Sequence, residues 1–364
     1  MVIPSKKDEV SAMTLKDIAQ KAGVSMMTVS NVINGKHNHV SEKTIQKVNK
    51  IIEECGYIPN LSARTLTNKK SNIIGIIISL DPTDDSLNNS FENPYISTMI
   101  GTIEHELRQN GYYTMVRSIS KQSDVLALLK NWNVDGIIFL YPHDSKEMES
   151  FLETAPCPVA MFDSSLTSSN FINVCSDDTK GLYVSTKYCI EHGHIHIAFV
   201  ADYKNNPLLT NRFLGYKQAL EEFQLPFHEE YVYHYSPSYE GGLQAGMDIA
   251  TSSNPITAVV TTADICAIGI MEGARRHGYT PPKDLSIIGY DNLSLCQYTF
   301  PKLTSISQNI TQKALLATKL LLEKIETGTL TTSSNPKTDV RIVERDSVIS
   351  LLPLPFWHSK KEYH

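Results

Sequence analysis

Cysteines and long apolar runs are both scarce in this sequence. The 364-residue chain has six cysteines, spread from Cys55 to Cys296 with no close pair. They form neither a disulfide framework nor a zinc-ligand spacing, which is typical of reduced thiols in a reducing compartment. No apolar segment is long enough to span a bilayer, and residues 1–13 are polar, unlike a signal peptide. We therefore expect a cytoplasmic protein with no membrane partner and a disordered tail at residues 1–13.

Catalytic and metal-binding motifs are missing as well. The sequence contains no phosphate-binding glycine-rich loop, nucleophile elbow or metalloprotease helix. His192, His194 and His196 are closely spaced, but they lack a carboxylate or cysteine at the usual ligand spacing. The pairs Asp84–Asp85 and Asp177–Asp178 are better explained as solvated or helix-capping carboxylates. We expect no metal, no cofactor and no enzymatic activity.

Charge is distributed unevenly along the chain. It carries 33 Lys and Arg against 39 Asp and Glu, a formal net charge of −6. Residues 1–71 hold 11 basic and 6 acidic side chains, so this segment is at 11 − 6 = +5 and the remainder is at −6 − 5 = −11. A small basic module on an acidic body is the asymmetry expected of a nucleic-acid-binding arm attached to a sensor.

The segment that begins at Thr14 predicts two short helices joined by a tight turn. Thr14 is a favoured N-cap, and apolar residues then recur at helical spacing until Gly23, which can adopt a positive φ and stop the helix. Ser25 can cap a second helix, with Val24 and Val29 forming a hydrophobic staple around that cap. Two helices with a glycine turn of this length are typical of the helix-turn-helix, whose second helix enters the DNA major groove.

A third helix and a short further segment follow. Ser41 can cap a helix that ends at Gly56, and Pro59 prevents its continuation. Asn60 opens the six-residue segment Leu61–Leu66, which is too short to stay helical alone in water because nucleation is costly. The segment therefore needs a partner to fold against.

These features together resemble the DNA-binding headpiece of the lactose and galactose repressor family of bacterial transcriptional regulators. The resemblance rests on Thr14–Ala19, Ala22–Ser25, Thr28–Ser30, Asn34–Gly35, Val40–Ser41, Gly56–Asn60 and Ala63–Arg64. It implies a helix-turn-helix domain at residues 14–59 and, at residues 60–70, a linker whose hinge helix forms only on operator DNA. In the family, the leucine at the end of that hinge helix, here Leu66, wedges into the minor groove.

The resemblance also implies which side chains contact DNA. Met26, Met27 and Asn31 take the base-reading positions, since asparagine can pair with adenine and methionine can contact a thymine methyl. Hydroxyl side chains such as Thr14 and Thr28 are expected to bind phosphates, which positions the domain without reading sequence. The full set of expected DNA contacts is Thr14, Ser25, Met26, Met27, Thr28, Ser30, Asn31, Asn34, Asn60, Ala63, Arg64 and Leu66.

From Ser71 onward the pattern alternates between buried strands and helices. Ile73–Ile78 is a β-branched run, as expected for a strand buried on both faces. Further strands are predicted at 113–116, 136–140, 159–162, 195–200, 258–260 and 285–289, and helices at 96–110, 179–191, 212–223, 242–250, 265–278 and 312–328. This alternation predicts parallel sheets covered by helices. A body of about 280 residues exceeds one comfortable core, so we expect two lobes.

The body resembles that of the same family, in which the chain crosses three times between two periplasmic-binding-protein-like lobes. The matching segments are Asn93–Tyr95, Val134–Ile138, Gly193–His194, Arg212, Gly215–Tyr216, Ser286–Asp291 and Val343–Arg345. The expected fold is α/β, with a three-helix helix-turn-helix headpiece and hinge helix followed by a two-lobed, doubly wound core. The core is expected at 71–350, with one lobe near 71–190 and 308–329, the other near 191–307 and 330–350, and a tail at 351–364.

The resemblance places a small effector in a cleft at the carboxyl ends of the strands. Carboxylates and a guanidinium can bracket vicinal hydroxyls while a ring stacks on a sugar face, and Arg212 and Asp291 carry most of this expectation. The full set of expected effector contacts is Asp81, Tyr95, Asp177, Arg212, Asp264 and Asp291.

Some of these positions have a second explanation. Asp177, Asp264 and Tyr95 could equally cap helices or hold loops, since aspartate is itself a favoured N-cap. Ala263 and Pro237 stand where many family members carry an asparagine and an aromatic side chain. No particular sugar is therefore implied.

We interpret the sequence as that of a cytoplasmic, homodimeric transcriptional regulator, a repressor that binds a pseudo-palindromic operator and is controlled allosterically by a sugar or sugar derivative. A family regulator that responds to a protein or a phosphometabolite is the alternative. A sugar-binding protein of another role is a weaker alternative: if secreted it would need a signal peptide, and an enzyme would need a set of catalytic residues in the cleft; the sequence shows neither. No heptad repeat follows Ser350, which favours dimers over tetramers.

Overall fold

The computed structural model describes residues 13–33, 37, 40–57, 70–79, 90–119, 125, 133–141, 145–166, 170–204 and 206–352. The chain divides into two compact units, Met1–Ser71 and Asn72–His364. Among the helices in the described ranges, none combines the length and the apolar character needed to cross a membrane.

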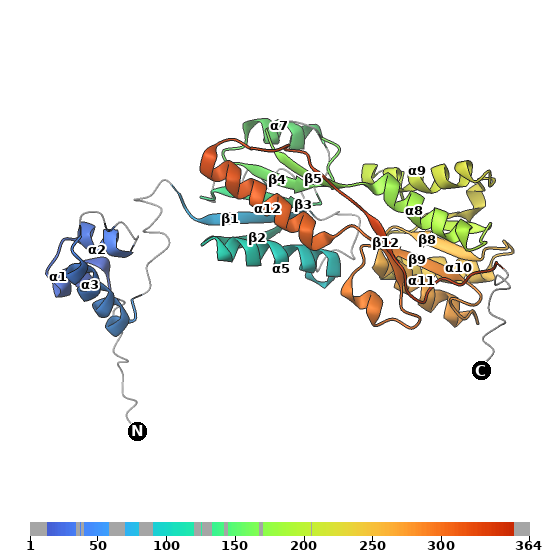
Figure 1. Cartoon of the computed structure of the whole chain (residues 1–364), viewed down its shortest axis with the longest axis horizontal. Helices are drawn as coiled ribbons and strands as arrows, with labels where there is room; N and C mark the ends of the chain where they lie inside the picture. The colour runs from blue at the N-terminus through green and yellow to red at the C-terminus, as the bar shows by residue number, and fades with distance from the viewer. Residues whose placement is uncertain are drawn as a thin grey trace, which may run out of the picture. The chain divides into compact units, whose positions relative to one another are not determined.

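The described part of the first unit consists of three helices around a small apolar core (Figure 1). They are α1 (Leu15–Ala22), α2 (Met26–Ile33) and α3 (Glu42–Cys55). Gly23 adopts φ 69°, which turns the chain sharply between α1 and α2. The buried core residues are Ile18, Ala19, Ala22, Val29, Val32 and Val48. The helix-turn-helix predicted from the sequence is confirmed.

The second unit contains two sheets, each with six strands in its described residues. The first sheet has the strand order β11-β5-β4-β3-β1-β2, with parallel neighbours throughout. Its strands are β1 (Ile73–Ser79), β2 (Tyr113–Ile119), β3 (Gly136–Leu140), β4 (Val159–Phe162), β5 (Ile172–Ser176) and β11 (Lys337–Thr338). Strand β1 is buried along almost its whole length, as its run of isoleucines predicts.

The second sheet has the strand order β12-β10-β9-β8-β6-β7. Its neighbours are parallel except for β12, which runs antiparallel to β10. Its strands are β6 (Ile197–Val200), β7 (Val232–Tyr233), β8 (Ala258–Thr261), β9 (Ser286–Tyr290), β10 (Thr304–Ser307) and β12 (Arg341–Val343). Two sheets in one unit, parallel apart from β12, confirm the expected two-lobed α/β core.

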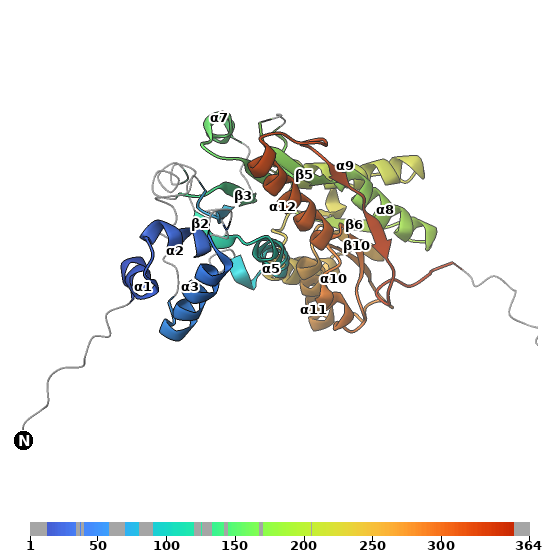
Figure 2. The same ribbon diagram turned by 60° about the vertical axis from the view of Figure 1, so that its left-hand side comes forward.

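Helices cover both sheets. They are α5 (Pro94–Gln109), α7 (Lys146–Thr154), α8 (Asp178–Glu191), α9 (Pro207–Glu222), α10 (Tyr239–Thr251), α11 (Asp264–Arg276) and α12 (Ile310–Thr327), with 3-10 turns η2 (Ser90–Glu92), η3 (Glu229–Tyr231) and η4 (Ser294–Gln297). Helices α5 and α12 pack side by side over the first sheet, as Figure 1 and Figure 2 both show. On the second sheet α8 pairs with α9 and α10 with α11. The first of these pairs is very close, since a Cβ at Gly215 would lie 2.0 Å from the carbonyl oxygen of Thr179.

The chain crosses three times between the sheets, from β5 to α8, from β10 to α12 and from β11 to β12. The crossings are hydrogen-bonded to one another. The hydroxyl of Ser176 donates to Oε1 of Gln308 at 2.9 Å, and the hydroxyl of Thr338 donates to the carbonyl of Cys175 at 3.3 Å. The carboxyl ends of the strands from both sheets are therefore connected near these crossings.

The boundaries between the lobes differ from the expected ones. Helix α8 falls in the range expected for the first lobe, yet it packs against α9, β10 and β12 of the second. Strand β11 falls in the range expected for the second lobe, yet it pairs with β5 of the first sheet. Amphipathic spacing in the sequence predicts that a helix covers a sheet, but it does not indicate which of the two sheets. Strands β5 and β10 were not predicted because they are short and interrupted by polar residues.

Candidate DNA-binding and effector sites

The second helix of the headpiece presents a mixed face to solvent. Val29 and Val32 are buried in the headpiece core, which leaves the intervening side chains of α2 on the other face. The side chains of Met26 and Met27 are 55% and 73% exposed, and Asn31 is half-buried. An apolar side chain held at the start of an exposed helix can reach a base edge without rearrangement.

The hydroxyls expected to bind phosphate already have partners within the headpiece. Thr14 and Asp17 form a capping box, and the hydrogen bond from the Thr14 side chain lowers the pKa of Asp17. The backbone N–H of Thr28 donates to the hydroxyl of Ser25 at 3.1 Å, which caps α2, and Ser30 is half-buried. The other expected DNA contacts lie outside the described residues: Asn34, Asn60, Ala63, Arg64 and Leu66.

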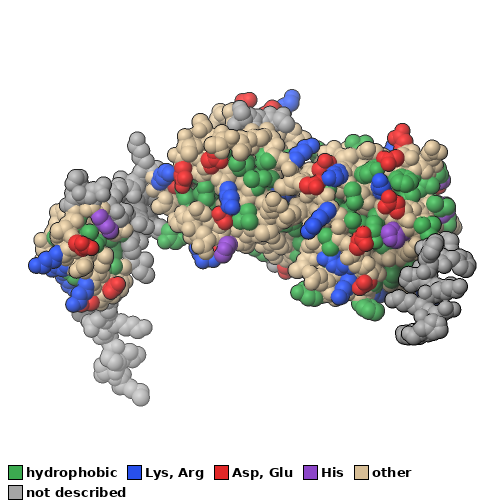
Figure 3. Space-filling view, viewed as in Figure 1, with side chains coloured by type: hydrophobic (Ala, Val, Ile, Leu, Met, Phe, Trp, Pro, Cys, Tyr) green, Lys and Arg blue, Asp and Glu red, His purple; other side chains and the backbone are tan. Residues whose placement is uncertain are grey.

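The headpiece also carries exposed lysines that were not among the expected contacts. Figure 3 shows lysine or arginine side chains on the visible face of this unit. The exposed lysines on its helices are Lys16, Lys21, Lys43, Lys47 and Lys50. Because phosphate neutralisation supplies sequence-independent affinity for DNA, such lysines can bind the DNA backbone at any sequence.

In the second unit, Arg212 is the best-defined of the expected effector residues. It lies on α9 and is only 5% exposed. Its Nε donates to Oδ1 of Asp178 at 2.8 Å, and its Nη1 donates to the carbonyl of Thr262 at 2.6 Å. The guanidinium carbon lies 3.7 Å from the centre of the Tyr290 ring, a cation–π distance. Arg212 thus connects α8, β9 and the end of β8.

Asp177 and Asp178 are adjacent in sequence, but only Asp178 is hydrogen-bonded to Arg212. Asp177 is the N-cap of α8, where its Oδ1 accepts from the backbone N–H of Lys180 at 3.1 Å. Asp178 is buried, and burial raises the pKa of its carboxyl although Arg212 opposes this effect. The alternative explanation of Asp177 as a helix cap is therefore the one its hydrogen bond supports.

Asp291 directly follows β9 in an unusual backbone conformation. Its φ is 112°, which costs on the order of 1–3 kcal/mol for a residue with a side chain and is found most often at functional sites. Its Oδ1 accepts a hydrogen bond from Nε2 of Gln308 at 2.5 Å. Burial, helped by the nearby carboxylate of Asp264, raises the pKa of Asp291 to about 8.

Lys313 was not predicted as a site residue, yet it completes this network. Its ammonium group is fully buried, on α12. Nζ donates to the hydroxyl of Ser176 at 2.9 Å, to Oε1 of Gln308 at 3.1 Å, and to the carboxylate of Asp163. We call the whole set the polar cluster: Asp163, Asp178, Arg212, Tyr290, Asp291, Gln308 and Lys313.

Asp264 serves a structural role inside the second lobe. Its Oδ2 accepts from the backbone N–H of Leu293 at 2.7 Å and from the thiol of Cys296 at 3.0 Å, and its Oδ1 accepts from the hydroxyl of Ser305 at 2.5 Å. Burial raises the pKa of Asp264 to about 6, and these hydrogen bonds lower it in part. Both oxygens are therefore used to hold the loop after β9 to strand β10.

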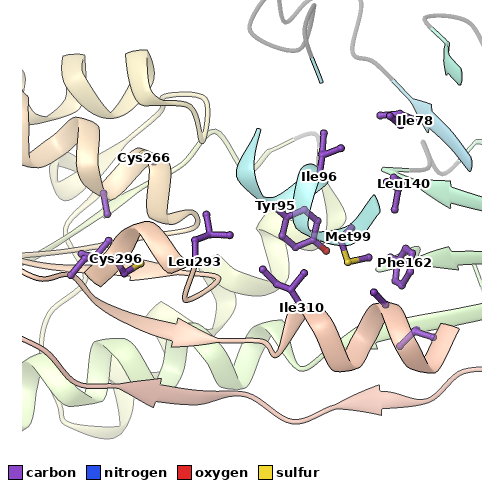
Figure 4. Packing of buried hydrophobic residues seen from close by; sticks show 14 of the residues in the cluster. Ile78, Tyr95, Ile96, Met99, Leu140, Phe162, Cys266, Leu293, Cys296 and Ile310 are labelled. Carbon is purple, nitrogen blue, oxygen red and sulfur yellow. The ribbon is translucent and has the colours of Figure 1, made fainter. Parts of the chain in front are cut away.

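Tyr95 lies beside the polar cluster at the start of α5. It is nearly buried, and its ring centre lies 5.8 Å from that of Tyr141. Figure 4 shows the ring with Leu293 and Ile310, which belong to the same apolar cluster. Leu293 lies in the loop between β9 and η4, and Ile310 is the first residue of α12. Burial raises the pKa of Tyr95, and the carboxylate of Asp163 raises it further. The remaining expected contact, Asp81, lies outside the described residues.

Two buried hydroxyls have no hydrogen-bond partner among the described residues. They belong to Ser79, the last residue of β1, and Thr262, the residue after β8. An unpaired buried hydroxyl costs free energy unless a ligand or water satisfies it. Both stand at the carboxyl ends of parallel strands, where ligands bind in open α/β sheets. The sequence signal that could have found them is a small hydroxyl residue directly ending a buried strand.

The histidine cluster is dispersed in the structure. His194 is buried, with its ring nitrogens 3.0 Å from the Thr257 hydroxyl and 3.0 Å from the Ile349 carbonyl. His196 approaches a tyrosine hydroxyl, and His192 a helix carbonyl. Within the described ranges no three histidine, cysteine or carboxylate side chains are grouped so that they could hold a metal.

Comparison with known proteins decides the family. Residues 14–60 match the pattern of bacterial regulatory proteins of the lacI family, and residues 186–348 match a periplasmic binding protein-like domain. The HTH-type transcriptional repressor PurR of Vibrio campbellii is 30% identical over 318 residues, which cover 86% of this chain and 92% of that protein. The chain belongs to the LacI family. Catabolite control protein A of Priestia megaterium is 31% identical over 325 residues, covering 88% of this chain and 95% of that protein.

The fold of this LacI-family chain is also that of a solved relative. The lac repressor dimer bound to operator and the anti-inducer ONPF has a TM-score of 0.81 at 25% identity, covering 93% of this chain and all of that one. The chain is therefore a DNA-binding transcriptional regulator with a periplasmic-binding-protein-like core, and not an enzyme.

Proposed function

We propose that this LacI-family regulator is a repressor that binds a pseudo-palindromic operator as a homodimer. A small molecule, a sugar or sugar derivative, lowers or raises its affinity for that operator. The observation that carries the proposal is the polar cluster, a buried set of charged groups that joins the carboxyl ends of both sheets at the crossings. A ligand that alters contacts there biases the arrangement of the lobes, and that is the form an allosteric signal takes.

Relatives support the type of ligand. One is a ribose operon repressor of Haemophilus influenzae, 29% identical over 317 residues. A LacI-family regulator from Enterococcus faecium was solved with bound ribose, at 28% identity and a TM-score of 0.67. The names of the relatives PurR and catabolite control protein A do not mention a sugar. A protein or phosphometabolite signal is therefore the second candidate.

Exposed rings on the second lobe support the homodimer. Tyr298 and Phe300, just after η4, are 82% and 89% exposed. Apolar side chains this exposed and this close together are typical of interaction surfaces. A helix-turn-helix that reads a pseudo-palindrome needs two copies related by a twofold axis, so a second copy of this chain is the partner that fits. Because its target is chromosomal DNA, we place the protein in the cytoplasm.

The proposal is tested by two measurements on the full chain. Selection of bound fragments from a random DNA library should yield an inverted repeat, since two headpieces in a dimer read two half-sites. A thermal-shift screen against monosaccharides should yield a ligand, because a ligand at a hundred times its dissociation constant adds ~2.7 kcal/mol of stability. That ligand should then change the affinity for the selected DNA. Enrichment of a single, non-repeated site, or a ligand that leaves DNA affinity unchanged, would contradict the proposal.

A further inference from the structure

We propose that the effector of this regulator is uncharged, and that the site excludes ligands bearing a phosphate group. The inference rests on the proposed function, because it concerns the ligand of the polar cluster. It comes from the charge balance of that cluster, in which Asp163 is paired with Lys313 and Asp178 with Arg212, while burial keeps the third carboxyl, Asp291, protonated at neutral pH. Both cations are already paired.

The ammonium of Lys313 has no donor left for a ligand. A lysine side chain has three N–H donors. They are taken by Asp163, Ser176 and Gln308, and the side chain is fully buried. Lys313 therefore neutralises the carboxylate of Asp163 and offers nothing to an anion.

The charge of the Arg212 guanidinium is balanced, but only part of its hydrogen-bonding capacity is used. Its charge is balanced by Asp178 at 2.8 Å, and one face is covered by the ring of Tyr290. Nε and Nη1 are used, while a guanidinium has five N–H donors in all. The remaining donors suit a hydroxyl or carbonyl oxygen, which needs a hydrogen bond but no net charge.

Among the described residues of the cluster, no unpaired cation is left to balance an anion. Asp291 is buried close to Asp264, and burial, helped by that neighbouring carboxyl group, holds the pKa of Asp291 well above its ordinary value. A phosphate placed beside these groups would be a buried charge with no free cation to balance it, in a region with little water, which is costly. An uncharged molecule avoids that cost.

The other groups at the site suit an uncharged, hydrogen-bonding molecule. The hydroxyls of Ser79 and Thr262, which lack a partner among the described residues, can each donate or accept. The ring of Tyr95 packs near that of Tyr141 in apolar surroundings. Sugars without phosphate and neutral heterocycles share this chemistry, whereas sugar phosphates do not.

Inorganic phosphate is the probe that tests the charge balance without knowing the natural effector. Thermal unfolding of the full chain is followed against phosphate concentration, with sodium chloride holding the ionic strength constant. We expect no phosphate-dependent rise in Tm for the wild type. The double variant Asp163→Asn and Asp178→Asn, which frees both cations, should gain a saturable rise of several degrees. Asp339→Asn, which removes an exposed carboxylate instead, is the matched control and should behave like the wild type.

Two results would overturn the proposal. One is a saturable rise in Tm for the wild type that disappears in Arg212→Gln or Lys313→Gln, since this would place an anion in the cluster. The other is the absence of any phosphate effect in the charge-removing variants. If the double variant does not fold, Asp163→Asn alone keeps the test available, because Lys313 retains Ser176 and Gln308. A rise in the wild type that survives both glutamine variants reports phosphate bound elsewhere and agrees with the proposal.

Matched ligand pairs extend the test to organic molecules. D-ribose with ribose 5-phosphate, and D-glucose with glucose 6-phosphate, are compared at equal ionic strength. Stabilisation by a parent sugar but not by its phosphate supports the inference, and the reverse order overturns it. The proposed function is judged separately, because these titrations contain no DNA: failure to bind an inverted-repeat operator would count against that function and leave the charge result intact.

Discussion

The guanidinium of Arg212 stacks on the ring of Tyr290, 3.7 Å from its centre, while its Nε is bonded to buried Asp178. The same side chain is thus an expected effector contact and half of a buried ion pair. Breaking such a pair by removing one partner leaves a buried charge uncompensated, which typically costs about 3–5 kcal/mol.

Arg212→Ala should therefore abolish the effector response and also lower the free energy of unfolding by about 3–5 kcal/mol. The double variant Arg212→Met and Asp178→Leu separates the two effects, because it leaves no unpaired charge. It should recover most of the stability but not the response, with operator affinity close to that of the wild type. Chemical denaturation and operator titration with and without ligand measure both. A double variant that regains the response would show that Arg212 acts only through folding.

Asn31→Ala should relax preference at one operator position by about 1–3 kcal/mol and leave nonspecific DNA binding nearly intact, because one base-edge contact is lost. Gln46→Ala, an exposed amide on α3, is the matched control and should change neither quantity. Binding to a set of single-base operator variants measures the preference. A uniform loss across all of these DNAs would instead assign Asn31 to the phosphate backbone.

Asp291→Asn should make the protein less sensitive to alkaline pH. The pKa of Asp291 is raised to about 8 in the folded state, mainly by burial, against an ordinary value of 3.8. Between these values the folded state binds more protons than the unfolded state, so the stability contributed by this group is present at low pH and is lost as pH rises through 8. The asparagine variant keeps the acceptor for Gln308 and has no such loss. The free energy of unfolding of the variant, relative to that of the wild type, should therefore rise by several kcal/mol between pH 5 and pH 9.

The control for this prediction is Asp339→Asn. Hydrogen bonding to Lys180 lowers the pKa of Asp339, so its stabilising effect is lost only at acid pH. The difference between this variant and the wild type should stay constant between pH 6 and pH 9. Urea denaturation across that range decides the matter. An equal pH slope for wild type and Asp291→Asn would show that Asp291 is ionised in the folded protein at neutral pH.

Phe300→Asp should convert dimers to monomers, and Tyr298→Asp should do the same. A buried charge at the centre of a subunit interface is costly because it has no partner there. Leu214→Asp, at a 50% exposed leucine on α9, is the matched control and should remain dimeric. Sedimentation velocity measures the subunit state, and operator affinity should fall with dimer loss. Dimers in both aspartate variants would place the subunit interface elsewhere.

The sequence by itself determined the local elements and hence the family. Caps such as Thr14 and Ser41, stops such as Gly23 and Gly56, and the isoleucine run of β1 act through neighbours in sequence, so pattern alone is sufficient to predict them. The headpiece was predictable almost helix by helix for this reason. Where strands are short and polar, as in β10, pattern fails because pairing within the sheet supplies the stability.

Only the tertiary structure decided which polar groups meet. Asp264 could have been a ligand contact or a loop anchor, and its bonds to Leu293 and Ser305, residues far along the chain, made it an anchor. Lys313 lies 150 positions from Asp163, and no local pattern relates them. Burial of a charge is tolerated only where packing delivers its partner, and packing is set by how helices and sheets from distant segments come together. The charge balance of the polar cluster is therefore a property of the folded chain.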